Sequence, residues 1–334
     1  MRLVVSGGVA VKLIFITLAV LVLSGCGGGD SSENGSTNPE PLVPLSDSQL
    51  VVNVSKDNVQ IFAKGEDRHS NRYLEYNLKH IVNDEINADL WRLYELYEVE
   101  NTSNVKPYSF IRVYSGKPIA NAGEWEAAIR EVGAGDFMGG YHGDERLTSV
   151  SLSVDGKQVS ISESQFVASN VSFYQVSKLY SWYTGEVVAF HEKEYKFTQS
   201  GIELDQRVEW LDSLNLSRAY LTMFPIKRKI DYTKGAQITD ISWSWPSGKV
   251  QDVSYPGFKL NISHDDNEIW LEGAESRFRA EIKMNSRPFL PGYSSFVTNS
   301  DTYNKAYFDI SGNYKTTPGE VWETNSTYKL TTYN

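Results

Sequence analysis

The chain has 334 residues, of which 40% are hydrophobic and 13% aromatic, and its formal net charge is −10 at pH 7. An acidic protein repels the phosphate backbone of nucleic acids, so no nucleic-acid partner is expected. The only cysteine is Cys26, which excludes an intrachain disulfide. The short basic run 227–229 is expected to be a solvated strand end.

Residues 1–25 have the pattern of an export signal. Arg2 and Lys12 give it a positively charged beginning, and an apolar run follows from Leu13 to Leu23. This run is shorter than the about 20 residues that a membrane span needs. We therefore expect a signal peptide, which is removed and takes no part in the fold.

The signal ends in Leu23-Ser24-Gly25-Cys26, which resembles the lipobox of bacterial lipoproteins. The resemblance implies that Cys26 is lipidated, becomes the new N-terminus and anchors the protein in a membrane. Gly27, in place of an aspartate, implies sorting to the outer membrane, where the protein would face the periplasm or the cell surface. Residues 26–47 are rich in glycine, serine, asparagine and proline, which predicts a flexible tether.

From residue 48 onwards, apolar and polar residues alternate in short segments that predict antiparallel strands. Turn residues at 155–156 and 199–201 predict hairpins. No second linker divides the chain, so residues 48–334 are predicted to form a single all-β domain. We expect a large antiparallel β-sandwich, supersandwich or jelly-roll-like, with one or two short helices. The predicted strands are 50–54, 59–63, 148–154, 158–162, 187–197, 202–210, 219–226, 238–245, 258–262, 268–272, 278–284, 306–310 and 327–332.

Two segments depart from this pattern. Residues 87–99 have apolar side chains at helical spacing, but they also fit a strand with Trp91 and Leu93 on one face, and the sequence does not decide between the two. Residues 123–132 predict a short helix with Asn121 as its N-cap. This helix would lead directly into the most reactive stretch of the chain.

That stretch runs from Asp136 to Arg146 and combines glycines with ionisable side chains. Glycine permits positive φ and close backbone approach, which suits a tight loop that directs its neighbours at a ligand. The alternative is a polar loop that only joins two elements. The candidate site residues in it are Asp136, Gly139, Gly140, Tyr141, His142, Asp144, Glu145 and Arg146.

A second group of candidates lies on the strand 187–197. His191, Lys193 and Tyr195 share one face because strand side chains alternate. This face suits a concave binding surface, or else it is an outward, solvated face. On the next strand Gln206 falls on the core side and needs hydrogen-bond partners. Its neighbour Arg207 is a substrate contact or an ion-pair partner of nearby acids.

An exported, tethered, aromatic-rich β-sandwich with His, Tyr, Lys and Arg candidates resembles the β-sandwich polysaccharide lyases and their mutarotase-like relatives. The resemblance implies β-elimination from a uronate-containing polysaccharide. This reaction needs a base for the proton α to the carboxylate, an acid for the leaving oxygen and a cation for the carboxylate. On this hypothesis His142 is the base, Tyr195 or Tyr141 the acid, Arg146 and Lys193 the cations, and His191 orients one of them.

Other readings remain open. Glycoside hydrolysis by Asp144 and Glu145 is less favoured, because adjacent residues do not easily flank one bond. A divalent metal held by His142, Asp144, Glu145 and His191 has no supporting motif, so no cofactor is expected. Nucleotide-binding loops and the serine-hydrolase elbow are missing from the sequence. A non-catalytic lipoprotein that binds glycan or an envelope protein is the main alternative to the enzyme.

Overall fold

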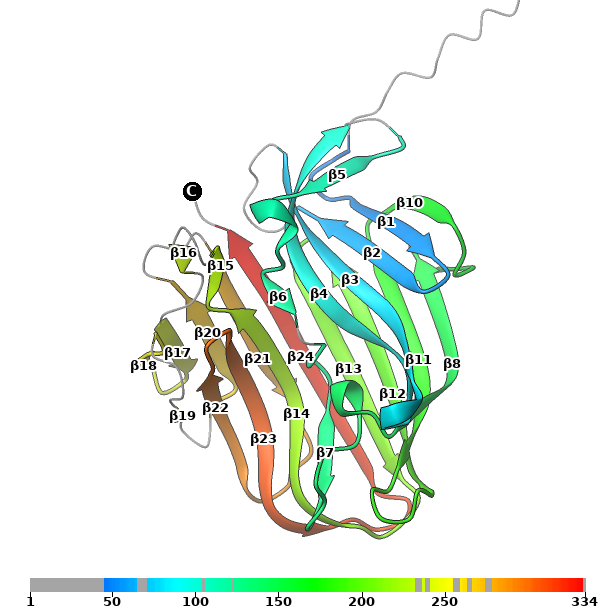
Figure 1. Cartoon of the computed structure of the whole chain (residues 1–334), viewed down its shortest axis with the longest axis vertical. Helices are drawn as coiled ribbons and strands as arrows, with labels where there is room; N and C mark the ends of the chain where they lie inside the picture. The colour runs from blue at the N-terminus through cyan, green and yellow to red at the C-terminus, as the bar shows by residue number, and fades with distance from the viewer. Residues whose placement is uncertain are drawn as a thin grey trace, which may run out of the picture. The chain divides into compact units, whose positions relative to one another are not determined.

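The fold of the chain is seen in a computed structural model (Figure 1). It describes residues 45–64, 71–103, 106–121, 123–231, 236–237, 241–254, 259–262, 266–273 and 278–332. The predicted signal, Cys26 and most of the predicted tether therefore lie outside the described residues. Within the described part of the chain, no helix has the length and apolar character needed to cross a membrane.

The largest sheet of the described residues has 17 strands. One antiparallel row runs in the order β9–β8–β11–β12–β13–β24–β21–β20–β17–β18, and a second runs β10–β1–β2–β3–β4 and continues to β5 and β6. A short parallel pairing of β4 with β8 joins the two rows. The strands are β1 (Leu50–Ser55), β2 (Asn58–Ala63), β3 (Arg72–Asn83), β4 (Ala88–Ser103), β5 (Ser109–Arg112), β6 (Ala120–Asn121), β8 (Glu145–Val154), β9 (Lys157–Val159), β10 (Ser164–Ala168), β11 (Val171–Tyr180), β12 (Val187–Thr198), β13 (Gly201–Trp210), β17 (Ile241–Trp245), β18 (Lys249–Asp252), β20 (Glu268–Glu272), β21 (Phe278–Ser286) and β24 (Val321–Thr332).

A second sheet lies in front of the β13–β24–β21 part of the first in Figure 1. Its order is β19–β22–β23–β14–β7, and a small third sheet pairs β15 with β16. In the described residues, three short 3-10 turns, η1 to η3, lie between strands. The bounds are β7 (Ala128–Glu131), β14 (Asn215–Lys227), β15 (Lys229–Asp231), β16 (Ala236–Gln237), β19 (Lys259–Ile262), β22 (Tyr293–Asn299), β23 (Tyr303–Lys315), η1 (Asp84–Ile86), η2 (Tyr114–Gly116) and η3 (Gly140–His142).

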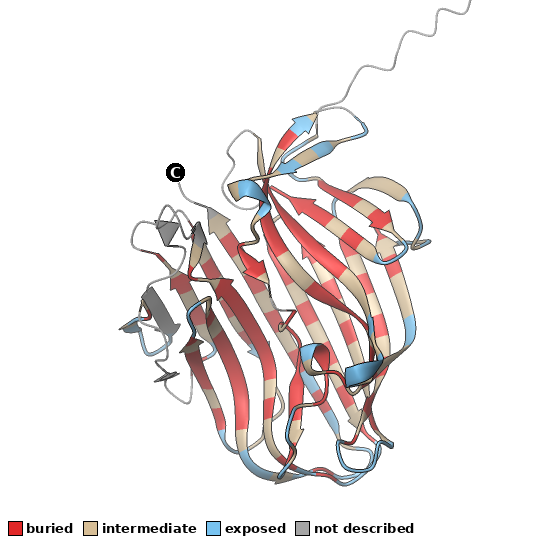
Figure 2. Cartoon of the chain, viewed as in Figure 1, coloured by how far each residue is buried: buried red, intermediate tan, exposed pale blue. Residues whose placement is uncertain are grey.

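The core lies on the inner face of the row that contains β11, β12, β13 and β24, and both the β1–β4 row and the second sheet cover it. Buried and partly exposed residues alternate along β11, β12 and β13, so one face of each strand points inward (Figure 2). Aromatic rings join the layers at the centre, where Trp125 lies 4.8 Å from Phe224 of β14 and 5.2 Å from Tyr328 of β24, measured between ring centroids. Burial of such large rings supplies much of the hydrophobic stabilisation of a sandwich.

The predicted all-β sandwich of antiparallel strands is confirmed. The undecided segment 87–99 is part of strand β4. The predicted helix at 123–132 is wrong, because Ala128–Glu131 pairs with β14 as strand β7 and Asn121 belongs to β6. Tertiary pairing here overrides a local helix signal. Residues 238–240 and 258 of two predicted strands lie outside the described residues.

Candidate active site

The glycine-rich stretch forms a closed loop between β7 and β8. Gly139 N donates to Gly143 O at 2.7 Å, which brings the two ends of the loop together. The φ angles of Gly139, Gly140 and Gly143 are 94°, 56° and 87°, a region that favours glycine. A Cβ atom on Gly143 would lie 1.9 Å from Ile86 O, so only glycine fits there.

On the outer side of this loop, a histidine and an aspartate form a pair. His142 Nδ1 lies 2.8 Å from Asp136 Oδ1, and the His142 side chain is 20% exposed. The rings of Phe137 and Tyr141 lie 5.0 and 5.6 Å from the imidazole. Within the described residues, Nε2 of His142 has no hydrogen-bond partner. A carboxylate on Nδ1 fixes the ring and leaves Nε2 to exchange a proton with a ligand.

Tyr141 is the exposed aromatic ring of the loop, with 46% of its surface accessible. The guanidinium of Arg92, from β4, lies 5.1 Å from the centre of this ring and 5.5 Å from the ring of Tyr94. Sequence reasoning missed Arg92, which stands between the apolar residues Trp91 and Leu93. The sequence did contain one signal for it, namely an arginine within an otherwise apolar strand segment.

Beneath the loop lies Glu145, the first residue of β8, with no exposed surface. Its Oε2 accepts a hydrogen bond from Gly140 N at 2.7 Å, while Oε1 lies 2.7 Å from Lys193 Nζ and 3.2 Å from His191 Nδ1. Lys193 Nζ and Glu145 Oε1 are close, but their angles do not meet hydrogen-bond geometry, so this contact is an ion pair. The hydroxyl of Ser177 also donates to Oε1.

The charge of Glu145 is set by these neighbours. Burial by itself raises the pKa of Glu145, but Lys193 and then His191 outweigh burial and hold it well below its usual range. Glu145 is therefore an ionised carboxylate inside the protein. Its charge strengthens the hydrogen bond that fixes the backbone of Gly140.

A second buried carboxylate, Glu126, supports the same point of the loop. The Tyr195 hydroxyl donates to Glu126 Oε1, and a Cβ atom on Gly140 would lie 3.5 Å from Glu126 Oε2. Burial raises the pKa of Tyr195, and the charge of Glu126 raises it further. Tyr195 is thus a neutral hydroxyl donor below the loop.

The structure places the predicted β12 residues differently from either expectation. His191, Lys193 and Tyr195 do share a face, but that face points into the core. It is neither a concave binding surface nor a solvated face. The physical reason is Glu145, whose buried charge needs a cation beside it and which gives these polar side chains a place in the interior.

The predicted residues Arg146 and Asp144 contact other partners than His142. Arg146 Nη1 lies 3.2 Å from Asn87 Oδ1 and 3.4 Å from Asp84 Oδ1, and Asn87 also donates to Asp144. Burial raises the pKa of Asp144. Among the described residues, no group of three or more His, Cys, Asp or Glu side chains is arranged to hold a metal ion.

On β13, Gln206 is a structural bridge and Arg207 an ion-pair partner. Gln206 Oε1 accepts from Ala127 N at 2.8 Å, and Nε2 donates to Leu221 O at 2.9 Å, so the side chain ties the segment before β7 to β14. Arg207 Nη1 lies 2.9 Å from Glu192 and 2.8 Å from Glu209. Both acids belong to the outer face of the sheet.

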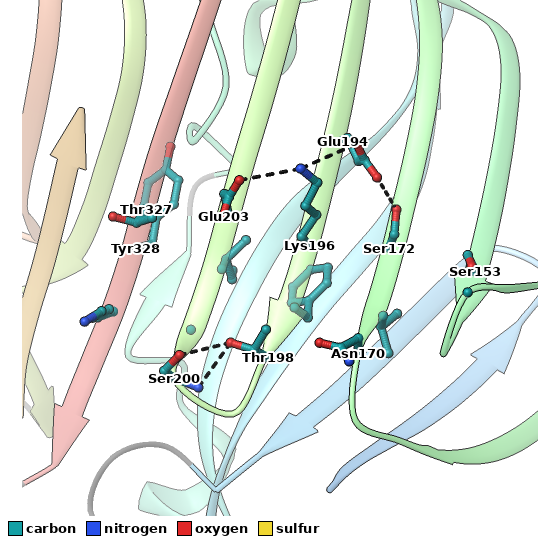
Figure 3. A pocket seen from close by; sticks show the side chains of 16 residues that line it. Ser153, Asn170, Ser172, Glu194, Lys196, Thr198, Ser200, Glu203, Thr327 and Tyr328 are labelled. Atoms are coloured by element: carbon teal, nitrogen blue, oxygen red, sulfur yellow. Dashed lines mark hydrogen bonds and ion pairs between the residues drawn. The ribbon is translucent and has the colours of Figure 1, made fainter. Parts of the chain in front are cut away.

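A groove of about 560 Å³ opens on that outer face, over β11, β12, β13 and β24 (Figure 3). Lys196 is central in it, with Glu203 Oε1 at 3.5 Å and Glu194 Oε2 at 3.8 Å, and Ser172 donates to Glu194. Asp205, 2.5 Å from the Lys196 ammonium, raises the pKa of Lys196. These paired polar groups suit a hydroxyl-rich ligand, and none of the groove residues belongs to the glycine-rich loop.

Comparisons with known proteins place this chain near structures of carbohydrate-active proteins only loosely. No family model matches, and no curated protein matches by sequence. The galactosidase domain of an α-galactosidase–sucrose kinase matches with a TM-score of 0.46 and 9% identity, over 83% of this chain and 40% of that one. An α-galactosidase from Lactobacillus brevis matches with 0.42 and 10%, over 87% and 41%.

A galactose mutarotase-like protein from Clostridium acetobutylicum matches with a TM-score of 0.42 and 11% identity, over 82% of this chain and 95% of that one. This chain thus spans about two fifths of the length of the two galactosidase structures. At these identities and TM-scores, the matches assign neither a family nor an activity to this chain.

Proposed function

We propose that the chain is an exported, lipid-anchored, carbohydrate-active protein of the outer membrane, and that its glycine-rich loop carries out β-elimination on a uronate-containing polysaccharide. The observation that carries the proposal is the exposed pair of Asp136 and His142, 2.8 Å apart, beside the accessible ring of Tyr141. This pair has the arrangement of a general base with an orienting carboxylate.

In the proposed reaction, His142 Nε2 removes the proton on the carbon next to the uronate carboxylate. The electrons of that C–H bond form the ring double bond, and the bond to the 4-linked sugar breaks. Its oxygen leaves with a proton from the Tyr141 hydroxyl. Asp136 stabilises the imidazolium that forms, because its negatively charged carboxylate next to Nδ1 favours the protonated ring. Tyr141 is preferred to Tyr195 as the acid because Tyr195 is buried against Glu126.

The predicted residues of β12 then act as positioning residues. Lys193 and His191 keep Glu145 ionised, and Glu145 holds Gly140, the residue before Tyr141. Tyr195 donates to Glu126, whose carboxylate also lies close to Gly140. A loop fixed from below keeps its acid and base in place, and misplacement of such groups costs rate steeply.

The test is absorbance of the unsaturated uronate formed when the mature protein is mixed with a panel of uronate polysaccharides. We expect His142→Ala to lower turnover by about 10² to 10⁴-fold, the usual contribution of a general base. Asp136→Asn should lower it less, since the imidazole itself remains. The matched control is His80→Ala, which removes another histidine paired with an aspartate (Asp89, 2.8 Å).

A normal circular dichroism spectrum would show that the variants fold. Turnover by His142→Ala at the wild-type rate would contradict the assignment of the base. Loss of turnover in His80→Ala to the same extent would show that the effect is one of stability rather than of chemistry.

The second candidate function is glycan binding without catalysis, which the paired polar groove around Lys196 favours. It predicts a flat absorbance trace and unchanged reducing ends across the panel, together with measurable glycan binding. Lys196→Ala should then weaken that binding, whereas His142→Ala should leave it unchanged.

A further inference from the structure

Arg92 is a buried cation for which the described residues provide no carboxylate partner. Only 6% of its surface is exposed, and its Nε and Nη1 atoms are closed off from solvent. Neither atom has a hydrogen-bond partner among the described residues. A Cβ atom on Gly123 would lie 2.8 Å from Arg92 Nε, so the chain covers the guanidinium at a point where only glycine leaves room.

Two other arginines that lie over tyrosine rings, Arg112 and Arg218, have a carboxylate as well. Arg112 lies 3.6 Å from the ring centre of Tyr97 and donates to Glu75 through Nε and Nη2, at 2.9 and 2.6 Å. Arg218 lies 5.6 Å from the ring of Tyr220 and 3.2 Å from Asp309.

Among the residues that the structure describes, Arg92 by contrast lies over the rings of Tyr94 and Tyr141 and has no carboxylate partner. Its cross-strand neighbour is Lys79, another cation, and the nearby Glu95 is already paired with Lys79 at 2.8 Å. A buried, unpaired cation costs folding free energy that an anionic ligand would offset. The unpaired charge therefore points to an anion that comes from outside the chain.

We propose that Arg92 is the residue that binds the substrate carboxylate, with the sugar ring held against Tyr141. This inference rests on the proposed function and names the residue that selects acidic over neutral sugars. Both the guanidinium of Arg92 and the imidazole of His142 contact the ring of Tyr141, at 5.1 and 5.6 Å. A carboxylate on Arg92 thus brings the neighbouring C–H bond to the side of the loop that carries the base.

Arg92 takes the place that the sequence suggested for Arg146 and Lys193. Arg146 is committed to Asp84 and Asn87, and Lys193 is committed to Glu145 in the interior. Because Nε and Nη1 are closed off from solvent, the carboxylate would be bound through Nη2, the guanidinium nitrogen that is not closed off.

The experiment measures binding separately from turnover. The parent protein is the full mature chain with His142→Ala, and the probes are oligosaccharides of galacturonate, glucuronate and mannuronate, each as the free acid and as the methyl ester. Calorimetry should show that at least one acid binds to the parent. When Arg92→Gln is added, the affinity for that acid should fall by about 30-fold or more. The esters should bind weakly to both proteins.

Two further variants keep the test decisive. Arg92→Lys keeps the charge but loses the planar guanidinium, so its affinity for the acid should lie between those of the parent and Arg92→Gln. It serves as the test if Arg92→Gln fails to fold. Arg287→Gln is the matched control, because Arg287 also lies over a tyrosine ring, 3.6 Å from the centre of Tyr293. Its binding should equal that of the parent.

The inference is overturned if Arg92→Gln binds the acid as the parent does, if acid and ester bind alike, or if no acid binds at all. A different outcome is that acid binding depends on Arg92, but the protein with intact His142 gives no unsaturated product. That result would support the role of Arg92 and reject the elimination reaction. The two proposals therefore fail separately.

Discussion

Glu145 is the residue on which the backbone of the loop most directly depends, since it binds Gly140 from inside the core. Lys193→Met would leave this carboxylate buried without its main cation. We expect a loss of about 3–5 kcal/mol in the free energy of unfolding, measured with urea. The double variant Glu145→Gln/Lys193→Met should recover much of this loss, because the uncompensated charge is gone. Equal stability of Lys193→Met and the double variant would contradict this explanation of the ion pair.

The same carboxylate gives stability a defined dependence on pH. Lys193 and His191 hold the pKa of Glu145 well below its usual range, so ionised Glu145 stabilises the folded state fully above its unfolded pKa of about 4.3. This contribution is lost as the pH falls through the lower, folded pKa. Between about pH 5 and pH 3, wild type should therefore lose more stability than Glu145→Gln. Parallel unfolding curves for the two proteins would show that Glu145 is not the group responsible.

At the scale of the element, the loop between β7 and β8 depends on a glycine that permits close approach. Gly143→Ala would place a Cβ atom 1.9 Å from Ile86 O, so the backbone must move and carry His142 with it. We expect a folded protein whose turnover falls at least tenfold. Gly156→Ala is the matched control, because Gly156 also has a positive φ, 76°, but open space around it. It should cost only about 1 kcal/mol of stability and leave turnover unchanged.

Strand patterns in the sequence predict the elements better than they predict which face is inside. The alternation in β12 and β13 is clear, yet His191 and Lys193 are polar residues on the core face, and only their contact with Glu145 of β8 explains this. Similarly β11 was not predicted, since Gln175 and Ser177 point inward and interrupt its apolar pattern. Such pairings join residues far apart in the chain, so a local pattern does not contain them.

The candidate site shows the same limit. Glycine spacing and reactive side chains identified the loop, and the pair of Asp136 and His142 lies within it. Arg92 comes from β4, and its approach to Tyr141 follows from the parallel pairing of β4 with β8. Non-local strand pairing therefore decides which cation reaches the loop.

At the scale of the whole molecule, the remaining proposal concerns where the protein works. Cys26 precedes the described residues, which begin at residue 45, and Cys26→Ser should leave the fold and the turnover unchanged. If Cys26 carries the lipid, this variant should lose the membrane anchor that acyl chains provide. In cell fractionation this variant should then move from the membrane pellet to the soluble fraction, while Ser32→Ala in the predicted tether stays in the pellet. Mass spectrometry of the N-terminus is needed beside fractionation, because a signal that is left uncut would also hold the variant in the membrane. A variant with its signal removed that still sediments with the membrane would reject lipidation as the anchor.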